Sequence, residues 1–207
     1  MTLRTAQEKL LALDLDRLPP PVRAAMFNQP MFSIPVHASG SGFDADSWAA
    51  LPADAPRDLF CKLGIKSWRD GGSLRPIARG LPLRPAVAKL LAEPTPAQRK
   101  VAKAWLETDT PLAAHLFAYV DFADISETRW LAGPREIRFL SACQRGRSAG
   151  ALAGAMPRIR QLVQQVSRGL APRIHVIEVA CLADGDVRLI EVNPGLQPAE
   201  IEALLAA

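Results

Sequence analysis

The sequence has few of the residues on which several common kinds of site depend. Its 207 residues include three cysteines, three histidines and one tyrosine. Cys61, Cys143 and Cys181 lie far apart in apolar strings, so we expect buried, reduced thiols and neither disulfide bonds nor a zinc site. The histidines lack metal-ligand spacing, and His175, which lies in an apolar string, is expected to be a core residue.

Long apolar runs, blocks of like charge and familiar catalytic strings are also missing. No run approaches the length of a membrane-spanning helix. Residues 1–18 alternate charge with leucine, which is typical of an amphipathic helix and not of a signal peptide. With reduced cysteines, this predicts a cytoplasmic protein without a membrane partner. The net charge is +4 with no block of basic residues, which argues against nucleic acid as a partner. No Walker or Gly-x-Ser-x-Gly string is present.

What the sequence does contain suits one α+β domain made of two small lobes. Hydrophobic residues make up 49% of the chain, enough for a substantial core. Apolar runs predict strands over residues 59–65, 116–122, 136–143, 173–182 and 187–193, with a short return strand over 148–152. Start and stop signals predict helices over residues 83–91, 96–106, 157–167 and 201–206, and loops over 38–43 and 66–75. The N-terminal lobe is expected over about residues 1–115 and the C-terminal lobe over about 116–207.

One predicted hairpin brings two acids together. Asp184 and Gly185 lie between two apolar runs, and such a pair is a strong hairpin signal because a type I′ turn needs positive φ at both centres. A two-residue turn at this place pairs Glu178 directly with Glu191. Asn193 then lies two residues further along, on the same face of the strand.

The neighbours of these acids make a metal attractive. Both faces of the hairpin are apolar, so two opposed carboxylates there would repel each other and be costly to bury. A divalent cation removes that conflict, and Glu178, Glu191 and Asn193 offer the oxygen ligands that Mg²⁺ accepts. The spacing leaves an alternative open, in which one or both acids lie at the sheet edge and pair with arginines.

The string from Glu178 through ADGD to IEVNP resembles the end of an ATP-grasp domain. In that superfamily a strand carrying an acid is followed by a turn and then an acid-x-Asn-Pro string. The resemblance implies an ATP-grasp fold, with two small α/β lobes and mainly antiparallel sheets that enclose a nucleotide cleft. It also implies that Glu178, Glu191 and Asn193 bind Mg²⁺. The chain departs from the usual pattern in having Glu at the first metal position, where Asp is common.

A second string agrees with this resemblance. Residues 135–139 (REIRF) resemble the Glu-Phe-Arg-x-Phe strand of small single-domain ATP-grasp proteins, a group with a eukaryotic assembly chaperone and bacterial and phage members. In that strand the arginine faces nucleotide phosphates, which implies this role for Arg138 and a place in the nucleotide site for Glu136. Taken alone, an arginine in the position of Arg138 more often forms a cross-strand ion pair with an acid than a functional contact.

A third string implies contacts on the other lobe. Residues 60–63 (FCKL), followed by SWRD, resemble the Lys-Leu and Ser-Pro-Lys-Asp strings of the same group, so Lys62 would contact the α and β phosphates. Backbone groups of Ala118, Tyr119 and Val120 would read the adenine edge, where the family places its hinge. Without the resemblance, Lys62 reads as a strand lysine with its head in water.

Two functions follow from these expectations. The first is an ATP-dependent carboxylate–amine ligase that works through an acyl phosphate, with ATP and Mg²⁺ as cofactors and with Lys62 and Arg138 as its catalytic cations. Its carboxylate and amine substrates are not named by the sequence. The alternative is an ATP-dependent assembly chaperone or binding module with little turnover, whose partner is a protein.

Overall fold

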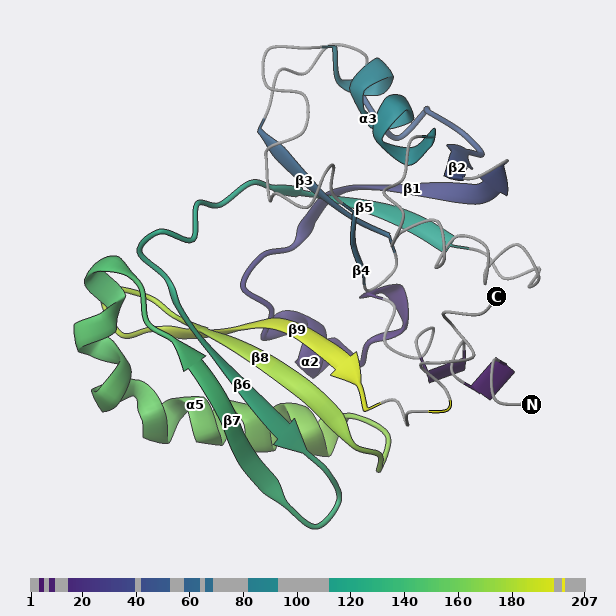
Figure 1. Ribbon diagram of the computed structural model, residues 1–207. Coiled ribbons are helices and arrows are strands. Elements are labelled where there is room, and N and C mark those ends of the chain that lie inside the picture. Colours follow the sequence, from purple (N-terminus) through teal and green to yellow (C-terminus); the bar gives the residue numbers. More distant parts are fainter. Residues whose placement is uncertain are drawn as a thin grey trace. The chain divides into compact units, whose positions relative to one another are not determined.

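A computed structural model describes residues 4–5, 8–9, 15–39, 42–52, 58–63, 66–68, 82–92, 112–195 and 199 (Figure 1). The chain divides into two compact units. The first comprises Met1–Leu11, Gln29–Tyr119 and Leu196–Ala207, and the second comprises Ala12–Asn28 and Val120–Gly195. The units thus separate after Tyr119, whereas the sequence placed the lobe boundary after residue 115. The helices expected over 96–106 and 201–206 lie outside the described residues.

The first unit is built on a five-stranded antiparallel sheet with strand order β2-β1-β5-β3-β4. Alternate residues of its strands are fully buried, among them Ile34, Cys61 and Leu116. The carbonyls of Leu91 and Ala92 lie so close to Gly42 that a Cβ there would collide with them. Its elements are β1 (Pro30–Ser39), β2 (Gly42–Ala45), β3 (Leu59–Leu63), β4 (Lys66–Trp68), β5 (Leu112–Ala118) and helix α3 (Leu83–Ala92).

Several expectations for this unit need correction. The strand over 59–65 and the helix over 83–91 are confirmed, but the strand expected over 116–122 lies at Leu112–Ala118. The sequence missed β1 because Pro30 and Pro35 demote a strand. The loop expected over 38–43 is where β1 ends and β2 begins, and the loop expected over 66–75 starts with β4.

The second unit is a four-stranded antiparallel sheet with strand order β7-β6-β8-β9. Helix α5 covers one face of it (Figure 1), and its Leu152, Ile159 and Val163 are buried there. The unit contains the 3₁₀ helices η1 (Leu15–Arg17) and η2 (Gly146–Ser148), the helices α2 (Pro20–Ala24) and α5 (Ala149–Gly169), and the strands β6 (Ser126–Ala132), β7 (Ile137–Cys143), β8 (His175–Cys181) and β9 (Val187–Pro194).

The start of α5 differs from the sequence expectation. The return strand over 148–152 is wrong, because the helix begins at Ala149 and runs to Gly169. The segment AGALAGA is rich in alanine, the best helix former, and it adds two turns ahead of Pro157. Pro157, read as a helix start, lies inside the helix with its side chain exposed. The expected helix over 157–167 is therefore the second part of a longer one.

Strand β6 escaped detection because polar residues occupy both of its faces. Ser126, Thr128 and Trp130 are buried, while Glu127 is half-buried and Arg129 is exposed. The buried hydroxyls are satisfied within the unit: Ser126 Oγ lies 2.7 Å from the Oγ of Ser148, and Trp130 Nε1 donates to Thr128 Oγ1 at 3.0 Å. A strand whose buried face is partly polar lacks the alternation that predicts strands.

The β8–β9 hairpin has the expected strands with a different turn. The two-residue turn is wrong: the loop has three residues, Ala183 to Gly185, and Leu182 N donates to the carbonyl of Asp186 at 2.9 Å. Gly185 has a φ of +81°, as glycine commonly does at the third loop position. This loop pairs Cys181 with Val187, one residue away from the predicted register.

A bulge then restores the predicted register further along. The pairing shifts between Glu178 and Val179, because Val179 faces Leu189 while Glu178 faces Glu191, which leaves Ile190 as the extra residue. The backbone N–H of Leu189 points away from β8 and donates to the carbonyl of Ala25 at 2.9 Å. The expected opposition of Glu178 and Glu191 is therefore confirmed, although the turn that predicted it was wrong.

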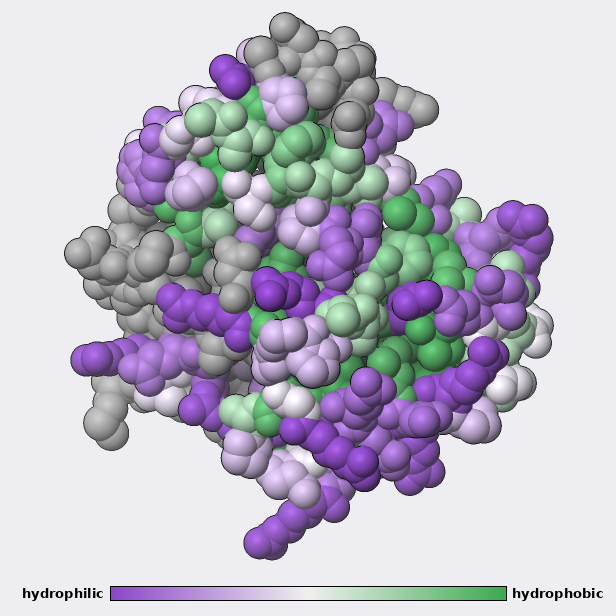
Figure 2. Space-filling model, turned by 180° about the vertical axis from the view of Figure 1, so that it is seen from behind, coloured by the Kyte–Doolittle hydropathy of each residue, from purple (hydrophilic) through white to green (hydrophobic). Residues whose placement is uncertain are grey.

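Few large apolar side chains are exposed among the residues that the structure describes. Phe139 and Leu140 of β7, which are 44% and 43% exposed, are among those that the structure describes. Figure 2 shows hydrophilic residues interspersed with hydrophobic ones on the face turned away in Figure 1. In the described parts of the chain, no helix is long and apolar enough to cross a membrane.

Candidate metal and nucleotide site

The open face of the four-stranded sheet, opposite α5, carries the candidate metal ligands. Glu178 of β8 and Glu191 of β9 are direct cross-strand partners, and both are half-buried. Asn193 follows on the same face and donates from Nδ2 to Glu191 Oε1 at 2.6 Å. Asn193 is likewise half-buried. The structure thus brings together the three residues that the sequence selected.

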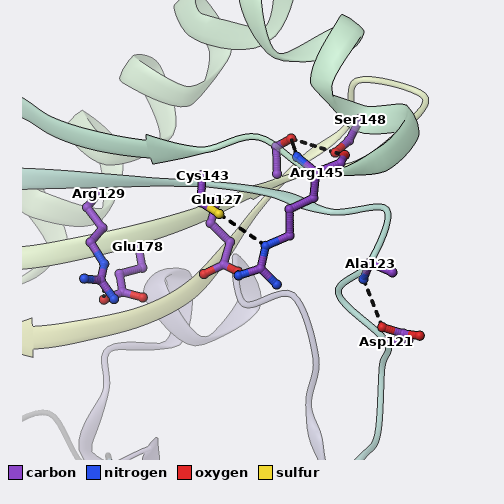
Figure 3. A network of polar contacts seen from close by, with 9 residues as sticks. Asp121, Ala123, Glu127, Arg129, Cys143, Arg145, Ser148 and Glu178 are labelled. Carbon is purple, nitrogen blue, oxygen red and sulfur yellow. Dashed lines mark hydrogen bonds and ion pairs between the residues drawn. The ribbon is translucent and has the colours of Figure 1, made fainter. Parts of the chain in front are cut away.

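A guanidinium group also lies at this place. Arg129 of β6 is the cross-strand partner of Glu178 on its other side, and its Nε is 3.1 Å from Glu178 Oε1. The side chain of Glu178 is 14% exposed and that of Arg129 is 58% exposed. Figure 3 shows the arginine reaching across to the carboxylate. The alternative that the sequence left open, an acid paired with an arginine, is therefore realised at Glu178.

Arg138 lies on the same face as the acids. It pairs with Leu131, which pairs with Val176, which in turn pairs with Asn193. Cross-strand partners point to the same side of a sheet, so this row places Arg138 and Asn193 on one surface. Arg138 is exposed and makes no ion pair with the residues that the structure describes.

A second acid–arginine pair lies one row further along this face. Arg145 Nη2 is 3.0 Å from Glu127 Oε1, and Arg145 Nε donates to Cys143 Sγ at 3.3 Å (Figure 3). Its side-chain contacts with Cys143 and Glu127 raise the pKa of Arg145. Cys143 is exposed, so the expectation that every cysteine is buried is wrong for it. Cys61 and Cys181 are buried, and all three thiols are free.

Lys62 lies in the first unit, on the more polar face of the five-stranded sheet. It is half-buried on β3, opposite His115 of β5, and its Nζ lies 5.9 Å from the ring centre of Phe117. His115 is fully buried, and its Nδ1 lies 2.9 Å from the Oγ of Ser33. The ammonium group of Lys62 thus lies over an aromatic ring, and the cross-strand row beside it contains His115 and Ser33.

The remaining predicted nucleotide contacts are backbone and turn positions. Ala118 is the last residue of β5, and Tyr119 N donates to the carbonyl of Asp58 at 2.9 Å. Tyr119 and Val120 stand on either side of the division between the two units. Glu136 is exposed in the turn before β7, where its carbonyl accepts from Gly133 N at 2.9 Å. Their roles toward a nucleotide remain predictions.

The donor set on the open face fits Mg²⁺. Two carboxylates and an amide carbonyl are hard oxygen ligands, and partly buried acids set opposite each other favour a cation between them. The guanidinium beside Glu178 shows that this place already attracts positive charge. No group of three or more His, Cys, Asp or Glu residues suited to a metal occurs in the described ranges.

Sequence reasoning missed Arg129, because it missed β6. The signal was present as Glu127-x-Arg129, an alternating pair of opposite charges that a strand would put on one face. Serine and threonine at the intervening positions concealed it. Once β6 is recognised, Glu178 of β8 has a neighbouring strand that carries an arginine, Arg129.

Comparisons with known proteins place the fold. No family profile matches the chain, and no curated protein matches it. Among solved structures, Cdc123 from Schizosaccharomyces pombe aligns with a TM-score of 0.55 at 13% identity, over 91% of this chain and 85% of that one. Its C-terminally truncated form gives 0.56 at 14% identity, with the same coverage. An L-amino acid ligase from Bacillus licheniformis aligns with a TM-score of 0.47 at 11% identity, over 95% of this chain and 46% of that one.

The chain has the ATP-grasp fold. The resemblance seen in the sequence is thereby confirmed at the level of fold, and so is the α+β class with mainly antiparallel sheets. At such low identity the likeness concerns the fold alone. The chemistry of the chain follows from its own residues.

Proposed function

We propose that this chain binds ATP together with Mg²⁺. Glu178, Glu191 and Asn193 would hold the metal, and Lys62 and Arg138 would contact phosphates. The observation that carries the proposal is the cross-strand pairing of Glu178 with Glu191, beside Asn193, on a sheet face that also presents Arg138. Phosphate binding is mainly charge neutralisation, and this face combines metal ligands with a cation.

The reaction we propose is carboxylate–amine ligation. ATP would transfer its γ-phosphoryl group to a substrate carboxylate, which releases ADP and gives an acyl phosphate. An amine would then attack the acyl carbon, release phosphate and form an amide. When bound, Mg²⁺ neutralises charge on the β and γ phosphates. The part left to Lys62 and Arg138 is to hold phosphate oxygens in place.

A second candidate is a nucleotide-controlled assembly chaperone with little turnover. The observation that favours it is the edge strand β7, whose Phe139 and Leu140 are both exposed. An exposed edge strand offers unpaired backbone groups to an extended segment of a partner protein. The sequence resemblance to a group that includes an assembly chaperone agrees with this candidate.

The first experiment is calorimetric titration of ATP into the wild type and the Glu191→Ala variant, with and without Mg²⁺. We expect metal-dependent binding to the wild type. The variant should bind Mg·ATP at least about a hundredfold more weakly, because one of the two proposed carboxylate ligands of the metal is lost. Absence of any ATP binding to folded wild type would overturn the proposal.

Glu127→Ala is the matched control for this titration. Like Glu191, Glu127 is a half-buried acid on the open face, but it pairs with Arg145 and lies one row away from the ligand triad. We expect its affinity for Mg·ATP to stay near that of the wild type. Release of ADP that depends on an added carboxylate and amine would then favour the ligase, and tight binding without turnover would favour the chaperone.

A further inference from the structure

The ion pair between Arg129 and Glu178 is unequal in burial. The two residues are cross-strand partners with Nε and Oε1 3.1 Å apart, yet the carboxylate side chain is 14% exposed and the arginine side chain is 58% exposed. Glu178 needs a nearby positive charge, because it is mostly buried and faces a second acid, Glu191 of the neighbouring strand β9. Arg129 supplies that charge from the solvent side.

Such a partner can leave at little cost. An exposed guanidinium regains water when it moves away, and a cation that takes its place keeps the buried carboxylate of Glu178 neutralised. The carboxylate cannot follow it into solvent, since Glu178 is part of a sheet strand flanked by β6 and β9. The acid is therefore fixed and its counter-charge is replaceable.

The destination of the arginine is on the same face. The row that contains Arg129, Glu178 and Glu191 lies next to the row that contains Arg138 and Asn193. Under the proposed function, phosphates lie over this surface. A guanidinium binds phosphate groups well, because its N–H groups donate in a fork that matches the phosphate oxygens.

We propose that Arg129 couples metal binding to nucleotide binding. In the nucleotide-free protein it serves as the counter-ion of Glu178 and competes with Mg²⁺ for that carboxylate. When metal and nucleotide bind together, Mg²⁺ takes over Glu178 and Arg129 turns to the phosphates. The inference rests on the proposed function, and it adds that the site resists free metal and accepts metal with nucleotide. Arg129 is thus a positioning residue and not a metal ligand.

The test measures metal binding without turnover. Mn²⁺ is titrated into the wild type, Arg129→Gln and Arg129→Lys, in the absence and presence of ADP, with bound metal followed by electron paramagnetic resonance. In the absence of ADP, we expect Arg129→Gln to bind Mn²⁺ about fivefold more tightly than the wild type, because its competitor is gone. The factor by which ADP strengthens Mn²⁺ binding should fall in the same variant. By linkage, the factor by which Mn²⁺ strengthens ADP binding should fall equally.

Two further variants make the result specific. Arg129→Lys keeps the charge and should resemble the wild type in the absence of ADP. Arg145→Gln removes the other arginine that pairs with an acid on this face, and it should leave Mn²⁺ binding unchanged. Melting temperatures close to that of the wild type would show that each variant is folded.

The outcomes separate the two claims. If the folded Arg129→Gln protein binds free Mn²⁺ no better than the wild type, or if Arg129→Lys binds it as tightly as Arg129→Gln does, competition by charge is wrong and only this inference is lost. If the wild type binds no Mn²⁺ even with ADP, the proposed function fails and takes the inference with it.

Discussion

Neighbouring residues of strand β8 point to opposite faces of one sheet and meet different surroundings. Ile177, Val179 and Cys181 are fully buried on the face that α5 covers. Glu178, between two of them, is only half-buried and faces Arg129 and Glu191. Because side chains alternate along a strand, residues of the buried core and residues of the candidate site are direct neighbours in the sequence of β8.

The two faces also differ in how they treat polar atoms. On the helix side, the buried hydroxyls of Ser126 and Ser148 lie within hydrogen-bond distance of each other inside the unit. On the open side, charged groups pair by twos near solvent, as in Glu127 with Arg145. The first arrangement rigidifies a core, and the second leaves charges that a ligand can rearrange. Three measurements test this contrast.

The largest expected difference is in thiol reactivity. Cys143 lies on the open face and is exposed, whereas Cys181 lies on the helix face and Cys61 is buried in the five-stranded sheet. Burial raises the pKa of Cys61 to about 12, and burial raises the pKa of Cys181 as well. We expect iodoacetamide to label Cys143 at least about 10³-fold faster than the other two, since these react only after local opening.

Mass spectrometry of peptides from the native protein measures these labelling rates. Labelling in denaturant is the control, and there all three cysteines should react at comparable rates. Rapid labelling of native Cys181 would show that the helix face is not closed.

The next effect is on stability. Ile177→Ala should lower the free energy of unfolding by about 3 kcal/mol, because it leaves a cavity under α5. Val176→Ala, one residue away on the open face and only half-buried, should lower it by about 1 kcal/mol or less. Denaturant unfolding followed by circular dichroism measures both values. Equal losses for the two variants would contradict the assignment of the faces.

The smallest effect concerns acid pH. His175 begins β8 on the helix face, where its Nε2 lies 3.2 Å from the carbonyl of Ala171 and its buried Nδ1 has no partner among the described residues. Burial lowers the pKa of His175, and the charge of Arg173 lowers it further. Its contribution to stability is therefore present above the unfolded pKa of about 6.5 and is lost as the pH falls below that value.

Melting temperatures from pH 8 to pH 5 would test this assignment. We expect His175→Phe to flatten the decline seen in the wild type. His37→Phe is the control, because His37 is exposed and pairs with Asp46. An equal decline in the wild type and in His175→Phe would assign the acid sensitivity to other groups.

The sequence predicted what local patterns encode and missed what depends on partners. Strands β8 and β9 carry strong apolar runs, Asp184 and Gly185 between them predicted the hairpin, and the string around Glu191 and Asn193 carried the resemblance to the ATP-grasp fold. Strand β6 was missed because Ser126 is satisfied by Ser148, a residue far away in the chain. The charge partner of Glu178 was missed for the same reason, since Arg129 meets it only through strand pairing. Pairing between distant segments is not visible in any short window.

The turn and the bulge of the β8–β9 hairpin each shift the strand register by one residue, in opposite directions, so that their effects cancel. The third loop residue displaces the pairing by one position, and Ile190 displaces it back before the acids are reached. Either change alone would put Glu191 out of step with Glu178 and turn one of the acids toward α5. The length of the loop and the presence of the bulge therefore depend on each other. A variant that grafts or shortens this hairpin has to keep both features or change both together.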